Sequence, residues 1–233
     1  KIGVLGATGP AGSGLAVRLA VNGFDVVIGS RSKYRAMEVR DQLIERWEGM
    51  TLAIDASDKC MVVCRTKRLN EVPEGEDAAI VRRTVATIEK ATGVKPQGWL
   101  GSGLQETWNT LEQLVDNGVQ YVADWVNDDQ PYKMTLEDGR TIMSVPYSTE
   151  INDKSAVDGH DVTSGEFEGM IRRQFDVLYR ESAQSGRVMA IALHPYITGV
   201  PHRIDALDSA LRYITGHQDV WLATGEEIID HYL

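Results

Sequence analysis

The stretch VQYVADWVNDDQPY, residues 119–132, decides the fold because an apolar run is followed directly by a polar cluster. The run 119–123 predicts a short buried strand. After it, Asp124, Asp128 and Asp129 place three carboxylates within six residues. Such groups repel one another, so a stable fold keeps them solvated, arranges them around a cation or uses them for acid/base chemistry.

The position of this cluster favours acid/base chemistry. In α/β proteins the active site lies at the carboxyl ends of the parallel strands, and the cluster follows a predicted strand directly. We therefore take Asp124 and Asp128 as candidate catalytic residues. The sequence leaves one alternative open, an ordinary solvated turn in which Asp and Asn side chains cap the next segment.

A second predicted strand end carries a histidine. The run 187–193, RVMAIAL, is hydrophobic and predicts a strand that ends at His194 and Pro195. If this strand and the strand 119–123 are parallel members of one sheet, Asp124 and His194 face one cleft. A carboxylate and an imidazole are the minimum for general acid/base hydrolysis, so His194 is a candidate catalytic residue. A lone histidine in a loop is more often a hydrogen-bonding or capping residue, and this alternative also stays open.

Helical and extended patterns alternate through the rest of the C-terminal part. Further strands are predicted over residues 140–146 and 220–223. Helices are predicted over residues 76–92, 107–117, 164–185, 204–216 and 225–232. Regular alternation of strands and helices predicts a parallel α/β sheet or barrel with its site at the strand ends.

The N-terminal segment has the strand–glycine turn–helix order of a dinucleotide-binding fold. A predicted strand, residues 1–6, opens onto Gly6, Gly9 and Gly12, and a predicted helix follows over residues 13–22. Such glycines let the backbone approach a pyrophosphate, which the helix N-terminus holds through its free N–H groups and its dipole. The alternative is an ordinary βαβ start in which the glycines serve packing only.

The end of the next predicted strand, residues 24–28, indicates which dinucleotide would bind. NAD-binding folds carry Asp or Glu there, which accepts hydrogen bonds from the ribose hydroxyls. Here Ser30 and Arg31 follow the strand, with Lys33 and Arg35 close behind. Cations of this kind bind a 2′-phosphate, so a dinucleotide at this site should be NADP.

Two parts of the chain resemble known families, and the first is the N-terminal stretch KIGVLGATGPAGSGLAVRLAVNGFDVVIGSR. This stretch resembles the start of the deazaflavin-dependent NADP reductases. The resemblance covers about the first fifth of the chain and ends near residue 50. It implies NADP contacts from Thr8, Gly9, Ser30, Arg31 and Arg35.

Five pieces beyond residue 69 carry the second resemblance: TIEKATGVKPQGWLG, YVADWVNDDQPY, VPYSTEIND, FDVLYRE and MAIALHPYITGVPHR. In combination they resemble the polysaccharide deacetylase-like (NodB-like) hydrolases, most closely the branch that includes cofactor-independent allantoinases. The resemblance implies a distorted (β/α) barrel and hydrolysis of a non-peptide carbon–nitrogen bond in a small-molecule amide, ureide or N-acetylated sugar. It also implies that His194 is the general acid and that Asp124 orients catalytic groups. Trp99 and Asn127 would line the substrate pocket.

The early strands of that family carry an Asp-Asp pair and a histidine motif, and neither precedes residue 69 here. We therefore predict a Rossmann-like segment over residues 1–68 and an incomplete distorted (β/α) barrel over residues 69–233. Open barrel edges need a cover, which the first segment or a second copy of the chain in a homo-oligomer would provide. Besides the hydrolase, two hypotheses remain: an NADP-binding oxidoreductase and a non-catalytic fusion of two incomplete enzymes.

Composition limits the partners of this 233-residue chain. Its hydrophobic content of 42% and charged content of 25% are typical of soluble globular proteins, and its net charge of −10 argues against nucleic acid or anionic membranes as partners. Cys60 and Cys64 form neither a C-x-x-C motif nor part of a zinc site, which predicts reduced thiols in a cytoplasmic protein. Because Asp128 and Asp129 are adjacent and point in different directions on an extended chain, we expect no metal site.

Overall fold

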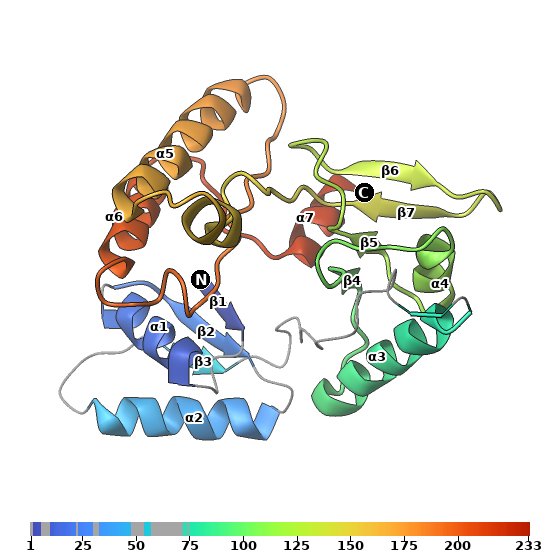
Figure 1. Ribbon diagram of the computed structural model, residues 1–233, viewed down its shortest axis with the longest axis horizontal. Coiled ribbons are helices and arrows are strands. Elements are labelled where there is room, and N and C mark those ends of the chain that lie inside the picture. The colour runs from blue at the N-terminus through green and yellow to red at the C-terminus, as the bar shows by residue number, and fades with distance from the viewer. Residues whose placement is uncertain are drawn as a thin grey trace. The chain divides into compact units, whose positions relative to one another are not determined.

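The structure is a computed structural model that describes residues 2–5, 10–21, 23–29, 33–47, 54–56, 72–73 and 75–233. The fold is α/β, as predicted, and its elements are labelled in Figure 1. The chain forms two compact units, each built from two stretches. The first unit comprises Lys1–Cys60 and Ser148–Leu222, and the second comprises Met61–Tyr147 and Ala223–Leu233. The predicted division of the chain after residue 68 stays a prediction.

The first unit contains a parallel sheet of three strands. They are β1 (Ile2–Leu5), β2 (Val26–Gly29) and β3 (Ile54–Ala56), with β2 in the centre. Helix α1 (Pro10–Val21) connects β1 to β2, and α2 (Lys33–Arg46) follows β2. The predicted strand–helix–strand order is therefore confirmed. A dinucleotide-binding fold and a (β/α) barrel share this order of their first strands, so the sheet favours neither.

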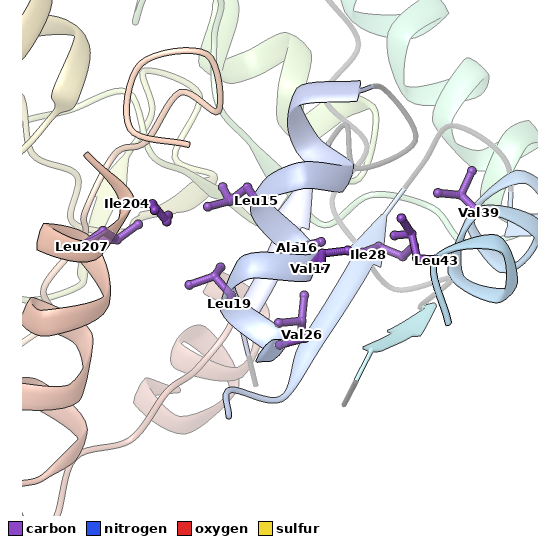
Figure 2. Packing of buried hydrophobic residues seen from close by; sticks show 11 residues of the cluster. Leu15, Ala16, Val17, Leu19, Val26, Ile28, Val39, Leu43, Ile204 and Leu207 are labelled. Carbon is purple, nitrogen blue, oxygen red and sulfur yellow. The ribbon is translucent and has the colours of Figure 1, made fainter. Parts of the chain in front are cut away.

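Helix α1 is buried on two sides, as Figure 2 shows. On one side it meets β2, where Val26 and Ile28 are buried. On the other side Leu15 and Leu19 point toward helix α6 (Ile204–Thr215). Each fully buried aliphatic side chain of this kind contributes about 1.5–3 kcal/mol. The core of the first unit therefore joins residues from distant parts of the sequence.

The rest of the first unit is mainly helical. It contains the π-helix η2 (Lys154–Gly159) and the long helix α5 (Ser164–Glu181), which packs on α6. At the start of α5, Thr163 and Glu166 form a capping box that satisfies free backbone N–H groups. The predicted helices over residues 164–185 and 204–216 are thus confirmed, with ends shifted by a few residues.

The predicted strand over residues 187–193 is wrong. Ala192 forms an isolated parallel bridge with Asn152, and no named strand includes this run. Met189, Ile191 and Leu193 are partly buried against the core of helices α5 and α6. The apolar pattern predicted burial correctly, but burial by side-chain packing needs no hydrogen-bonded partner strand. The strand predicted over residues 220–223 is also wrong, since that segment forms no ladder.

The second unit has a mixed sheet of four strands in the order β4-β5-β7-β6. Strands β4 (Gly98–Trp99), β5 (Tyr121–Val122) and β7 (Thr141–Ser144) are parallel, and β6 (Tyr132–Thr135) is antiparallel to β7. Helices α3 (Asp77–Thr92), α4 (Thr110–Asp116) and α7 (Gly225–Tyr232) confirm three of the predicted helices. The predicted strands 119–123 and 140–146 are present in shortened form.

The antiparallel strand corrects the prediction of an entirely parallel sheet. Strands β6 and β7 are joined by a tight turn in which Gly139 has a φ of 84°. Asp138 precedes this glycine, and its Oδ1 accepts a hydrogen bond from Arg140 N at 2.9 Å. An Asp-Gly pair is a common signal for a hairpin. It was overlooked because the sequence was interpreted as regularly alternating strands and helices. In the described ranges, no helix has the length and apolar character required to cross a membrane.

Candidate functional site

Asp124 lies just beyond β5 and is only 8% exposed. Its Oδ1 accepts a hydrogen bond from Gly101 N at 2.5 Å. Gly101 belongs to the loop after β4, and the parallel pairing of β4 with β5 brings this loop beside Asp124. A Cβ atom at Gly101 would lie 2.7 Å from Asp124 Oδ2. Glycine is therefore needed where the backbone approaches the carboxylate.

A second carboxyl group, Glu106, comes from the same loop and lies close enough to Asp124 that each carboxyl acts on the pKa of the other. Burial and the nearby charge of Asp124 raise the pKa of Glu106 to about 8, from an ordinary value of 4.5. Burial also raises the pKa of Asp124 to about 6, although the hydrogen bond from Gly101 opposes this shift. These shifts identify the two carboxyls as a functional-site candidate.

His194 is held by another aspartate, Asp153, which is completely buried. Asp153 Oδ1 lies 2.7 Å from His194 Nδ1, and Asp153 Oδ2 accepts a hydrogen bond from His194 N at 2.8 Å. Thr198 Oγ1 donates to the same Oδ2 at 2.6 Å. A carboxylate can only accept, so Nδ1 carries the proton of this bond and Nε2 is left for a substrate. The side chain of His194 is 35% exposed, which keeps the ring accessible.

Asp153 and Glu106 are the two site residues that the sequence reasoning missed. Asp153 lies in the piece VPYSTEIND, which was quoted for the resemblance without a role for its aspartate. Glu106 follows strand β4 and the glycine loop Gly101–Gly103. Its position after a strand end was the sequence signal that could have marked it as a site residue. Asp124 and His194 belong to different units, and their predicted action on one substrate stays a prediction.

Asn127 and Asp128, which also follow β5, are exposed. Asp128 Oδ1 accepts hydrogen bonds from Asp129 N at 2.8 Å and Gln130 N at 3.0 Å, which is an Asx turn. Asn127 pairs through its Nδ2 with the hydroxyl of Tyr132 at 2.8 Å. The local structure at Asp128 therefore matches the turn alternative, and its catalytic role stays a prediction.

Trp99 lies at the end of β4 and is 6% exposed. Its Nε1 has no hydrogen-bond partner within the described part of the chain. A buried N–H group without an acceptor costs roughly 1–3 kcal/mol. The proposed role of Trp99 in a substrate pocket would provide an acceptor for this group.

Most of the predicted NADP contacts lie outside the described residues: Gly6, Thr8, Gly9, Ser30 and Arg31. Gly12 lies in α1, and Arg35 is an exposed residue of α2 that forms an ion pair with Glu38 at 2.7 Å. The NADP prediction is thus untested. Among the residues that the structure describes, no three His, Cys, Asp or Glu side chains are grouped closely enough to hold a metal ion.

The fold is α/β, and comparison with known proteins shows which proteins the chain resembles. No family model matches the chain. A protein of Schizosaccharomyces pombe named "Putative polysaccharide deacetylase" is 33% identical over 173 residues, which are 67% of this chain. The chain spans about half of that relative, 54% of its length.

Solved structures agree with this relationship at the level of the fold. A PuuE allantoinase matches with a TM-score of 0.71 and 23% identity, covering 94% of this chain and 72% of the allantoinase chain. A "probable Polysaccharide deacetylase" from Pseudomonas aeruginosa matches with a TM-score of 0.70, the same identity and the same coverage. Over about two thirds of its length the chain is similar in sequence to a protein named as a polysaccharide deacetylase, and its fold resembles the NodB-like deacetylase domain. The resemblance of the N-terminal segment to NADP reductases gains no support from these comparisons.

Proposed function

We propose that this protein hydrolyses a non-peptide carbon–nitrogen bond, as a relative of polysaccharide deacetylases and allantoinases. The observation that carries the proposal is the 2.7 Å contact between His194 Nδ1 and the buried Asp153. A histidine oriented in this way is a usual general acid or base in hydrolysis. The relationship to the S. pombe protein supports the choice of reaction.

In the proposed mechanism His194 supplies the proton for the leaving nitrogen. An amine is a poor leaving group until it is protonated, so cleavage of the bond requires a general acid near that atom. Because Asp153 holds Nδ1, the proton would be delivered from Nε2. Asp124 would orient or activate the water molecule that attacks the bond. Trp99 and Asn127 would line the substrate pocket. The substrate would be a small-molecule amide, a ureide or an N-acetylated sugar.

A screen of the purified parent protein on allantoin, other ureides and N-acetylated sugars tests the proposal. The readout is the ring-opened ureido acid for allantoin and released ammonia, amine or acetate for the open-chain ureides and N-acetylated sugars, and we expect turnover of at least one of these classes. His202→Ala is a matched control, since His202 is an exposed histidine close in sequence to His194, and this variant should retain the parent's rate. A folded parent that is inactive on every class would overturn the proposal and favour the non-catalytic fusion.

A further inference from the structure

Glu106 and Asp124 each leave one buried carboxyl oxygen without a donor. Within the described chain, Glu106 Oε1 and Asp124 Oδ2 are both buried and have no ordinary hydrogen-bond partner. The two side chains are nevertheless within hydrogen-bonding reach of each other. Two ionised carboxylates offer only acceptors, so they cannot form this bond unless one of them carries a proton. A single proton would satisfy both oxygens.

We propose that Glu106 and Asp124 share one proton, held between Glu106 Oε1 and Asp124 Oδ2, so that the pair carries a single negative charge in neutral solution. The remaining hydrogen bonds show where that charge lies. Gly101 N donates a hydrogen bond to Asp124 Oδ1, whereas the Trp125 side chain lowers the pKa of Glu106 less than burial and the charge of Asp124 raise it. With its additional backbone donor, Asp124 is the better site for the charge, and Glu106 is the protonated member.

In the described part of the chain, the groups that shift the pKa values of Glu106 and Asp124 include no cation. The charged group that acts on Glu106 is Asp124, and no Lys or Arg contributes to the shift of either carboxyl among the described residues. Asp77 of α3 is the acidic side chain bonded to Thr107, the residue after Glu106. It already accepts from Thr107 Oγ1 at 2.6 Å and from Gln113 Nε2 at 2.9 Å, and these bonds lower its pKa. A proton is therefore the available means of reducing the repulsion between Glu106 and Asp124.

The shared proton makes the charge of this site depend on pH. In the folded chain the pKa of Glu106 is about 8, so the pair keeps its proton in neutral solution, whereas an ordinary Glu loses it near 4.5. The folded state thus binds more protons than the unfolded state, and the free energy of unfolding falls as the pH rises from about 4 to about 8. If the protein is the proposed hydrolase, Glu106 would be a positioning residue that sets the charge of Asp124 during catalysis.

Infrared difference spectroscopy tests the shared proton directly. The parent should show the carbonyl stretch of a protonated carboxyl at pH 7, and this band should disappear on titration with a midpoint near pH 8. Glu106→Gln should remove the band, while Glu137→Gln, which changes an exposed glutamate in the same unit, should retain it. A band that is absent at pH 7 in the parent, or unchanged in Glu106→Gln, would overturn the proposal.

Urea unfolding supplies an independent measurement. We expect the unfolding midpoint of the parent to be lower at pH 9 than at pH 6, and we expect this difference to shrink in Glu106→Gln but not in Glu137→Gln. Should Glu106→Gln fail to fold, the band titration of the parent decides alone, since a midpoint below pH 6 would contradict a shared proton. Neither measurement needs a substrate, so failure of the hydrolase proposal would leave both results interpretable.

Discussion

Asp153 of the first unit and Asp124 of the second are both buried aspartates, but their partners differ. Asp153 accepts hydrogen bonds from His194 N, the His194 ring and the hydroxyl of Thr198. Asp124 accepts one backbone hydrogen bond, from Gly101, and faces another carboxyl group at its second oxygen. Two aspartates of similar burial therefore have different neighbours. Hydrogen-bond donors surround Asp153, whereas the carboxyl group of Glu106 lies beside Asp124.

This difference indicates two distinct uses of a buried carboxylate. Three donors satisfy an anion and fix its position, which suits Asp153 to orienting the ring of His194. A carboxylate beside a carboxylic acid is poised to exchange a proton, because loss of that proton places two negative charges in contact. Substitutions at His194, Asp153 and Asp124 would show whether Asp153 and Asp124 have these different roles or the same one.

The largest effect is expected for His194→Ala, which removes the proposed general acid. Loss of such a group typically lowers the rate by about a hundred- to ten-thousand-fold. We expect this loss in kcat for any amide, ureide or N-acetylated sugar that the parent hydrolyses, with the circular dichroism spectrum unchanged. Unchanged turnover in His194→Ala would mean that the His194–Asp153 pair is only structural.

For Asp153→Asn we expect a smaller kinetic loss together with reduced stability. An amide at this position presents an N–H group to one of the three donors and can hold His194 in the wrong tautomer. The expected loss is roughly ten- to a hundred-fold in kcat with little change in KM, and the free energy of unfolding should fall by about 1–3 kcal/mol. Loss of stability without a selective loss of kcat would contradict a positioning role.

Asp124→Asn should have the opposite effect on stability. Its amide can still accept from Gly101 N through Oδ1 and can donate to Glu106, so the contact between two acids becomes an ordinary hydrogen bond. We expect unfolding free energy at pH 8 to be unchanged or raised by about 1 kcal/mol, and activity to fall about tenfold, less than in His194→Ala. A strongly destabilised Asp124→Asn would show that Asp124, like Asp153, acts mainly as a structural anion.

The smallest effect concerns the dinucleotide proposed for the N-terminal part of the first unit. If this part binds a cofactor, NADPH should bind about tenfold or more tightly than NADH, because Arg31 and Arg35 would bond the 2′-phosphate. Arg31→Asp should abolish or reverse the preference in a fluorescence titration. Equal affinities for the two nucleotides would remove the argument drawn from the basic residues after β2.

Helices that depend on interactions within one segment were predictable from the sequence, whereas strand pairing was not. Helix α5 was predictable because its apolar spacing and its capping box, Thr163 with Glu166, lie within one continuous segment. The strand predicted over residues 187–193 failed because an apolar run shows that a segment is buried but not whether a partner strand lies beside it. The hairpin of β6 and β7 had a local signal at Asp138 and Gly139, which the expectation of a parallel sheet outweighed.

By itself the sequence determined that the chain is α/β, where most helices lie, and that Asp124 and His194 are the candidate acid/base residues, because these features depend on local spacing and residue chemistry. Only the tertiary structure decided which carboxyl group meets each of them. Asp153 lies 41 positions from His194 in the chain, and Glu106 reaches Asp124 from a different loop. Folding brings these groups together, and burial away from water then determines whether a carboxyl remains an anion held by donors or keeps a proton.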